Sequence, residues 1–262
     1  MADGHRASVQ RATSFGVLSM AAAGIAACGH KRPQPVPATA PPVYTTPSYP
    51  APAPRPSTGG IPITRVPEGG ISAEDKEFIL SHRPIYSEEG SATWYTAHAG
   101  RKAANGQVFS DEALTAAHRT LPMGSLIVVT NLRTRQTSAM RISDRGPFVP
   151  SAIIDLTKAS AQSIGIWPGS GKVRLDVYET PKPMDVGGRW CVQIGPFLSE
   201  RKATRFKARL LNDYPGSKVI EFAGERSYWV RIRPQGDDRE QAEEIARRLQ
   251  PDEGIAYLTR LD

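Results

Sequence analysis

Residues 114–132 read LTAAHRTLPMGSLIVVTNL, and the second half of this stretch has the β-branched and apolar composition of a buried strand. Three more β segments lie around it, namely SATWYT at 91–96, QTSAMRISD at 136–144 and KVRLDVYE at 172–179. One short helix is predicted over DLTKASAQSIG, with Asp155 or Thr157 as its N-cap and Gly165 at its end. Four β segments and one helix within about 90 residues favour a small closed barrel, because closure leaves no exposed sheet edge.

The order of the motifs in this region is specific. SATWYT is followed by GRKAANGQVF at 100–109, by the 114–132 stretch, by RISDRGPF at 141–148 and by IIDLTKASAQSIG at 153–165. This series closely resembles the rare lipoprotein A family. The resemblance implies a six-stranded double-psi β-barrel, a fold that the family shares with expansins and some lytic transglycosylases.

Asp144 is the candidate acid of this barrel. It ends a predicted strand, and the following Arg145-Gly146-Pro147 turn is expected to present its carboxylate at the barrel mouth. A carboxylic acid there can protonate a glycosidic oxygen. A lytic transglycosylase needs no second carboxylate, because the 6-hydroxyl of muramic acid attacks its own anomeric carbon and gives a 1,6-anhydro sugar. The four residues DRGP alone leave a salt bridge or a turn cap as the alternative role of Asp144.

The resemblance points to two further residues of the catalytic set. After Ala-Asn-Gly the family usually has a glutamate implicated in catalysis, whereas this chain has Gln107, whose amide binds sugar hydroxyls but exchanges no proton. His118 matches the family histidine and is expected to orient the acid, although a buried histidine bonded to the backbone is an equal alternative. The aromatic residues expected either to stack on sugars or to fill the barrel core are Trp94, Tyr95 and Phe148.

A second domain is predicted at 188–262, after a short linker at 181–187. The order of its segments is strand, helix, strand, strand, helix, strand, so that it forms an α+β domain of βαββαβ topology. Two helices on one face of a four-stranded sheet leave the other face for a ligand. The domain closely resembles the sporulation-related repeat (SPOR) domain through WCVQIGPF at 190–197, ERKATRFKARL at 200–210 and SYWVRIRP at 227–234. The resemblance implies a ferredoxin-like fold that binds glycan strands lacking stem peptides.

Strand alternation assigns side chains to the two faces of this sheet. Trp190, Val192 and Ile194 are expected toward the helices, and Cys191 is expected on the open face. The candidate glycan-binding residues of the open face, which match family positions linked to glycan, are Gln193, Trp229 and Arg231. The alternatives are a solvated sheet face or a sheet that stacks RNA bases.

The amino terminus is typical of an exported lipoprotein. Arg6 and Arg11 precede an apolar stretch, Phe15–Ala27, that is too short to span a membrane and is interpreted as a signal peptide. Its end, Ile25-Ala26-Ala27-Cys28, resembles the lipobox, which implies acylation of Cys28 and anchoring in a membrane facing the periplasm. Gly29 in place of aspartate favours the outer membrane in a diderm bacterium. An ordinary secretory signal with an incidental cysteine is the alternative.

Between these parts lies a tether. Twelve of the 23 prolines fall between Pro33 and Pro67, a composition that excludes regular structure and favours an extended, disordered chain. The predicted parts are therefore a signal peptide at 1–27, the tether at 28–70, a short helical brace at 71–87, the barrel at 88–180, the linker and the SPOR domain.

Charge and composition exclude several other functions. The net charge of +7 is spread evenly along the chain, and no basic stripe or recognition motif supports binding of nucleic acid. The five histidines and two cysteines lack metal-ligand spacing, so that no metal site or other cofactor and no structural disulfide is expected.

Two functions remain. The leading hypothesis is a lipid-anchored lytic transglycosylase that cleaves denuded peptidoglycan, plausibly at the division septum, with Asp144 as acid and base and His118 assisting. The alternative is a wall-binding lipoprotein whose barrel binds glycan without cutting it, because Gln107 stands at the place of the family glutamate.

Overall fold

The computed structural model describes residues 67, 69–221, 227–249, 251 and 253–262. The predicted signal peptide, the lipidation residue Cys28 and nearly all of the Pro-rich tether lie outside these residues. Among the described residues, no helix has the length and apolar character needed to cross a membrane.

Six strands close into a barrel, which confirms the fold that the family resemblance implies. Their order around the barrel is β1-β5-β2-β4-β3-β6. The pairs β1/β5 and β2/β4 are parallel, and the other neighbours are antiparallel. The strands are β1 (Tyr86–Trp94), β2 (Thr115–Ala117), β3 (Leu126–Asn131), β4 (Thr137–Asp144), β5 (Ala152–Leu156) and β6 (Gly171–Glu179).

The interior of the barrel is filled by alternate apolar side chains of its strands. Fully buried members of this core are Ile127, Val129, Met140, Ile142, Ile154, Val173 and Leu175. Helix α2 (Lys158–Ser163) follows β5 directly, and its N-cap is Thr157, whose side chain accepts a hydrogen bond from the amide of Ser160. Asp155, the other predicted cap, instead belongs to β5, so that the helix starts later than its apolar pattern alone indicates.

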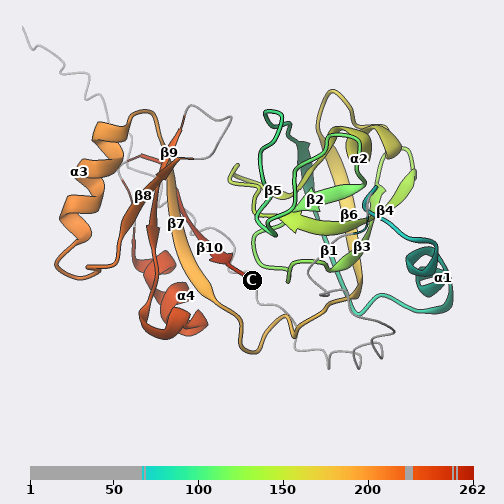
Figure 1. The fold of residues 1–262 in the computed structure, drawn as a ribbon. Helices are drawn as coiled ribbons and strands as arrows, with labels where there is room; N and C mark the ends of the chain where they lie inside the picture. Colours follow the sequence, from blue (N-terminus) through green and yellow to red (C-terminus); the bar gives the residue numbers. More distant parts are fainter. Residues whose placement is uncertain (1–66, 68, 222–226, 250, 252) are drawn as a thin grey trace, which may run out of the picture. The chain divides into compact units, whose positions relative to one another are not determined.

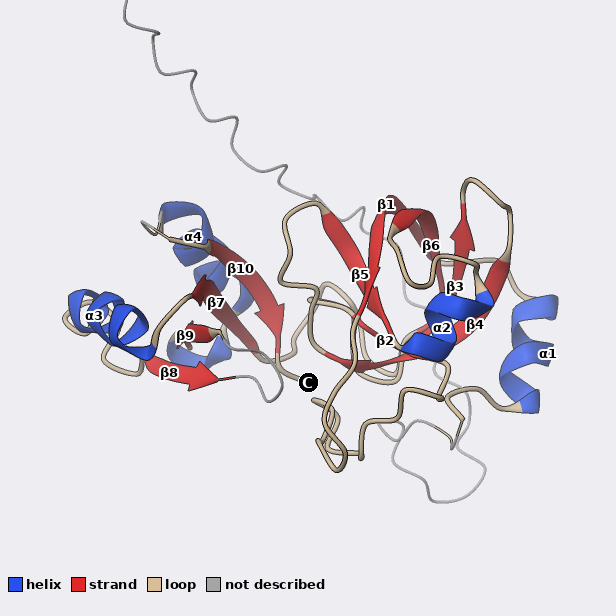
Figure 2. Ribbon diagram, turned by 90° about the horizontal axis from the view of Figure 1, so that it is seen from above, coloured by secondary structure: helices blue, strands red, loops and turns tan. Residues whose placement is uncertain are grey.

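Helix α1 (Ala73–Ser81) lies on the outside of the barrel (Figure 2). A capping box starts the helix, because Ser72 and Asp75 exchange hydrogen bonds between side chain and backbone. Asp75 also joins the helix to β4. Its carboxylate accepts from Nε of Arg141 at 3.0 Å and from Nη2 at 2.5 Å, although the Asp75 side chain is almost fully buried. This bidentate ion pair fixes the brace to the barrel wall.

The C-terminal domain is a four-stranded antiparallel sheet in the order β10-β7-β9-β8, with α3 and α4 on one side (Figure 1). Trp190, Val192 and Ile194 pack against these helices, which confirms the predicted alternation of faces. Ser199 caps α3 and Asp238 caps α4. The elements are β7 (Trp190–Phe197), α3 (Glu200–Leu210), β8 (Lys218–Glu221), β9 (Tyr228–Ile232), a 3₁₀ turn at Gln235–Asp237, α4 (Arg239–Arg248) and β10 (Ile255–Arg260).

The buried pair between α1 and β4 gives a testable expectation. Arg141→Ala should lower the free energy of unfolding by about 3–5 kcal/mol, because it leaves the buried carboxylate of Asp75 without its charge partner. Urea titration followed by tryptophan fluorescence measures this loss.

The matched control is Arg174→Ala, which removes an arginine from an exposed pair with Asp176 on β6. The control should cost about 1 kcal/mol or less. Equal losses for the two variants would contradict the assigned role of the Asp75–Arg141 pair.

Candidate functional site

Asp144 lies at the last position of β4, and both of its carboxylate oxygens are engaged. Oδ1 accepts from the backbone amides of Ala104 at 3.0 Å and Arg145 at 2.9 Å. Oδ2 accepts from the hydroxyl of Tyr95 at 3.3 Å and forms an ion pair with Nη1 of Arg101 at 3.1 Å. The residue is only 3% exposed. Asp144 is therefore a carboxylate of fixed orientation, held by two main-chain and two side-chain donors.

A cavity of about 510 Å³ opens beside this carboxylate. Asp144 is its one acidic lining residue, and most of the others are basic. The lining residues are Arg101, Lys102, Ala104, Asp144, Arg145, Arg189, Arg231, Arg233 and Leu261. The structure therefore places Asp144 among the lining residues of a cavity, with its carboxylate almost fully buried.

Tyr95 is a hydrogen-bond donor to this acid. Burial and the neighbouring charge of Asp144 raise the pKa of Tyr95 well above its ordinary value, so that the phenol stays protonated. The Tyr95 ring lies 5.0 Å from that of Phe109, and the guanidinium of Arg101 is 5.9 Å from the Tyr95 ring centroid. Arg101 and Phe109 were missed as site residues by sequence reasoning, although both belong to the loop motif that contains Gln107.

Gln107 lies on the loop that covers Asp144, but its side chain bonds within that loop. Its Oε1 accepts from Nδ2 of Asn105 at 2.6 Å, and the backbone amide of Gln107 donates to Oδ1 of Asn105. The loop is tied to β4 through the Asn105 amide, which donates to the carbonyl of Ser143, and through the Ala104 amide on Asp144. Gln107 thus shapes the loop that contacts the acid.

His118 is buried, and both ring nitrogens have partners other than the Asp144 carboxylate. Nδ1 accepts from the backbone amides of Thr120 and Leu121 at 3.2 and 3.0 Å. Nε2 therefore carries the proton and donates it to Oε1 of Glu88 at 3.1 Å. Burial lowers the pKa of His118, which favours the neutral ring. This geometry is that of the alternative role, a buried histidine bonded to the backbone. The contact between His118 and Asp144 is through the main chain, where the amide of His118 donates to the carbonyl of Asp144.

Trp94 and Tyr95 are adjacent in sequence but lie in different surroundings. The indole of Trp94 donates to the carbonyl of Pro168 at 2.8 Å and packs 4.0 Å from the Trp167 ring against the barrel core. Tyr95 instead contacts Asp144. The structure therefore places Tyr95 against Asp144. Trp94 instead packs against the barrel core, which was the alternative to stacking on a sugar.

The predicted open face of the SPOR sheet is covered in the structure, which corrects the expectation that its candidate residues are accessible. Gln193 is 0% exposed and Trp229 is 1% exposed. The face assignment is correct, but the ring of Phe148 from the barrel lies 5.0 Å from that of Trp229. Arg231 is partly buried and lines the cavity next to Asp144. Sequence alternation identifies a face of a sheet but does not tell what covers it.

Metal binding finds no support in the described part of the chain, where no group of three or more His, Cys, Asp and Glu residues is arranged to hold an ion. Cys191, the free cysteine of the described residues, is buried, and burial raises the pKa of its thiol to about 11.

Two family models match the chain. Residues 87–177 match the model described as lytic transglycolase, and residues 186–256 match the SPOR domain. The first match coincides with the closed barrel and the second covers most of the four-stranded sheet with its helices.

Curated relatives match a little less than half of the chain. The chain is 50% identical over 123 residues to a protein of Synechocystis named "Probable endolytic peptidoglycan transglycosylase RlpA", a match that covers 46% of this chain and 38% of the relative. It is 38% identical over 120 residues to the Endolytic peptidoglycan transglycosylase RlpA of Pasteurella multocida, with 45% of this chain and 41% of the relative covered. The matched part thus spans about two fifths of each of these relatives.

Among solved structures, a Streptomyces papain inhibitor matches 37% of this chain and 97% of its own, with 17% identity and a TM-score of 0.31. An expansin of Clavibacter michiganensis matches 43% of this chain and 58% of its own, with 14% identity and a TM-score of 0.29. The chain thus carries a region that matches the lytic transglycolase model followed by a region that matches the SPOR domain, and it is similar to curated proteins named RlpA over less than half of its length.

Proposed function

We propose that the protein is a lytic transglycosylase that cleaves the β-1,4 bond between N-acetylmuramic acid and N-acetylglucosamine in denuded peptidoglycan. The observation that carries this proposal is the position of Asp144, an oriented carboxyl group at the wall of a cavity in a barrel that matches the lytic transglycolase model. The curated relatives of the chain carry the names "Probable endolytic peptidoglycan transglycosylase RlpA" and "Endolytic peptidoglycan transglycosylase RlpA", which supports the proposal.

In the proposed reaction one carboxyl group acts twice. Protonated Asp144 first donates its proton to the glycosidic oxygen, and the bond from this oxygen to C1 of the muramic acid breaks. The 6-hydroxyl oxygen of the same muramic acid then bonds to C1 and returns its proton to Asp144. The products are a 1,6-anhydromuramic acid end and a free 4-hydroxyl on N-acetylglucosamine. No water is consumed, and Asp144 ends in the protonation state in which it began.

The residues around Asp144 fix its orientation during these two transfers. The amides of Ala104 and Arg145 hold Oδ1, so that Oδ2, bonded to Tyr95 and Arg101, is the oxygen assigned to the reaction. An ion pair with Arg101 is a contact of the ionised carboxylate, and Asp144 has to leave this contact to carry a proton. His118 acts as a positioning residue, because its ring holds the turn at Thr120 and Leu121.

The proposed location is the cell envelope. The SPOR match supports association with peptidoglycan, and the family precedent favours strands without stem peptides and the division septum. Acylation of Cys28 would anchor the chain in the outer membrane on its periplasmic side, with the Pro-rich tether spanning the distance to the wall.

Asp144→Asn is expected to abolish cleavage, with a loss of about 10²–10⁴-fold in rate, because an amide neither donates nor accepts the proton. Mass spectrometry of anhydromuramyl products from purified denuded glycan measures the rate, and pull-down with the same glycan should be retained. Asp176→Asn on β6 is the matched control with full activity. Unchanged turnover in Asp144→Asn would reject the assignment.

Glycan binding without any anhydro product in the unaltered chain would favour the alternative, a wall-binding protein that does not cut.

Gln107→Glu tests the departure from the family pattern. Glutamate keeps the oxygen that accepts from Asn105 and adds a group able to exchange protons on the loop that contacts the acid. We expect cleavage to rise about tenfold or more, in line with the contribution of a second general acid or base. An unchanged or reduced rate would show that Gln107 acts only through the shape of its loop.

His118→Asn distinguishes positioning from proton transfer. The variant should lower kcat/KM for glycan cleavage, while the limbs of the rate profile between pH 5 and 8 stay where they are in the unaltered chain. The reason is that a neutral His118 with both nitrogens engaged adds no titration to the reaction. A limb that disappears in His118→Asn would assign the proton transfer to this residue.

A further inference from the structure

Glu88 is a largely buried carboxylate that the proposed reaction does not use. It lies on β1 with its side chain 15% exposed, and it does not line the cavity beside Asp144. Burial by itself raises the pKa of Glu88, but the hydrogen bond from His118 and the positive charge of Arg119 bring this pKa below its ordinary value. The carboxylate therefore stays ionised inside the barrel wall. An ionised group is costly to bury unless it serves its partners, and the partner here is His118.

The ring of His118 has one orientation that satisfies its surroundings. Nδ1 accepts from the amides of Thr120 and Leu121, so that the ring proton lies on Nε2 and needs an acceptor. Oε1 of Glu88 is that acceptor, at 3.1 Å. A ring turned by 180° would place carbon atoms at both positions and leave three buried N–H groups without acceptors. Glu88 and the two amides thus select the orientation of the ring together.

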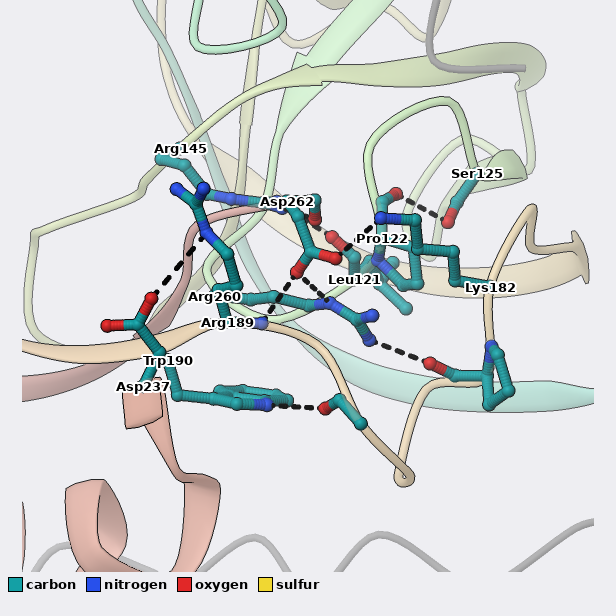
Figure 3. A network of polar contacts seen from close by, with 12 residues as sticks. Leu121, Pro122, Ser125, Arg145, Lys182, Arg189, Trp190, Asp237, Arg260 and Asp262 are labelled. Carbon is teal, nitrogen blue, oxygen red and sulfur yellow. Dashed lines mark hydrogen bonds and ion pairs between the residues drawn. The ribbon is translucent and has the colours of Figure 1, made fainter. Parts of the chain in front are cut away.

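The turn that His118 holds is bonded to the residues around the acid. The amide of His118 donates to the carbonyl of Asp144 at 3.2 Å. Nη1 of Arg145 donates to the carbonyls of His118 and Leu121 at 3.0 and 2.7 Å (Figure 3). The backbone amide of Arg145 in turn donates to Oδ1 of Asp144 at 2.9 Å. A displacement of residues 118–121 therefore moves the groups that hold the Asp144 carboxylate.

The order of the strands separates Glu88 from the acid itself. Strands β5 and β2 lie between β1, which carries Glu88, and β4, which ends at Asp144. Ala117 of β2 is paired with Asp144, and His118 follows Ala117 directly. The described contacts thus lead from Glu88 to Asp144 through His118.

We propose that Glu88 is a positioning residue for glycan cleavage, which fixes the ring of His118 and, through residues 118–121, the carboxylate of Asp144. The inference rests on the proposed function, because it adds a residue to the set that orients the acid. The neutral ring of His118 asks for an acceptor at the place of Oε1 and not for a negative charge. Proton transfer depends on a close and aligned approach, so that a shifted acid lowers kcat, whereas KM, which reflects the glycan contacts, stays unchanged.

Two variants with opposite expectations test this role in the full chain. Glu88→Gln keeps an acceptor oxygen at the same reach and removes the charge, whereas Glu88→Asp keeps the charge and withdraws the oxygen by one methylene. We expect kcat for anhydromuramyl products from denuded glycan to stay within about threefold in Glu88→Gln and to fall about tenfold or more in Glu88→Asp, with KM unchanged in both. Glu89→Asp, at the exposed next position of β1, is the matched control with full activity. A kcat of Glu88→Gln no higher than that of Glu88→Asp would overturn the inference.

A double variant tests the path from Glu88 to the acid. If Glu88 acts through the ring, Glu88→Asp/His118→Asn should be no slower than His118→Asn alone, because the ring that Glu88 orients is already absent. Losses of the two single variants that multiply in the double variant would show an independent path and would contradict the assigned role.

Amide hydrogen exchange, followed by NMR, separates this inference from the proposed function. In Glu88→Asp the amides of Thr120 and Leu121 should exchange about tenfold faster, whereas the amides of β3 in the barrel core should keep their rates. Faster exchange over β3 as well would show a general loss of stability and contradict the positioning role. Absence of anhydro products from the unaltered chain would contradict the proposed function, and exchange would then decide the inference by itself. Local loss of protection at the two amides supports it, and unchanged protection overturns it.

Discussion

The carboxylate of Asp144 is the constraint on which the site depends. A carboxylate that leaves water at the end of a strand needs hydrogen-bond donors, and here they come from the residue after β4, from the residue after β1 and from the covering loop. Strands β1 and β4 are not neighbours in the closed order, since β5 and β2 lie between them, and the hydroxyl of Tyr95 after β1 makes the contact with Asp144. The double-psi arrangement thus serves as the frame that brings Tyr95 and the loop containing Arg101 to one acid.

The packing of the SPOR domain on the barrel extends this frame. Arg145, the residue after the acid, is buried, and burial lowers the pKa of its guanidinium to about 9 while it still holds three carbonyl oxygens. Asp262 is held in turn by Lys182 and Arg260 (Figure 3). The chain segment that carries Asp144 is therefore also the one that contacts the C-terminal residue Asp262.

The sequence predicts the longer elements of the fold because their periodicity is unambiguous. Strand β7 coincides with the apolar run from Trp190 to Phe197. The capping residues Ser72 and Ser199 lie immediately before helices α1 and α3. Strands β2 and β5 could not be predicted from the residue pattern. They have three and five residues respectively, which are largely buried and show no alternation of polar and apolar side chains. Asp144 was proposed as the acid from its motif, whereas Arg101 and the cover over Trp229 depend on contacts between segments distant in sequence, which no local pattern records.

The burial of Cys191 has a consequence for the reactivity of its thiol. With its pKa near 11, about one such thiol in ten thousand is ionised at neutral pH, and the thiolate is the species that attacks disulfides. Oxidants and disulfides therefore meet very little thiolate at Cys191 once the sheet has formed. Folding thus protects the sulfur of Cys191 from forming mixed disulfides.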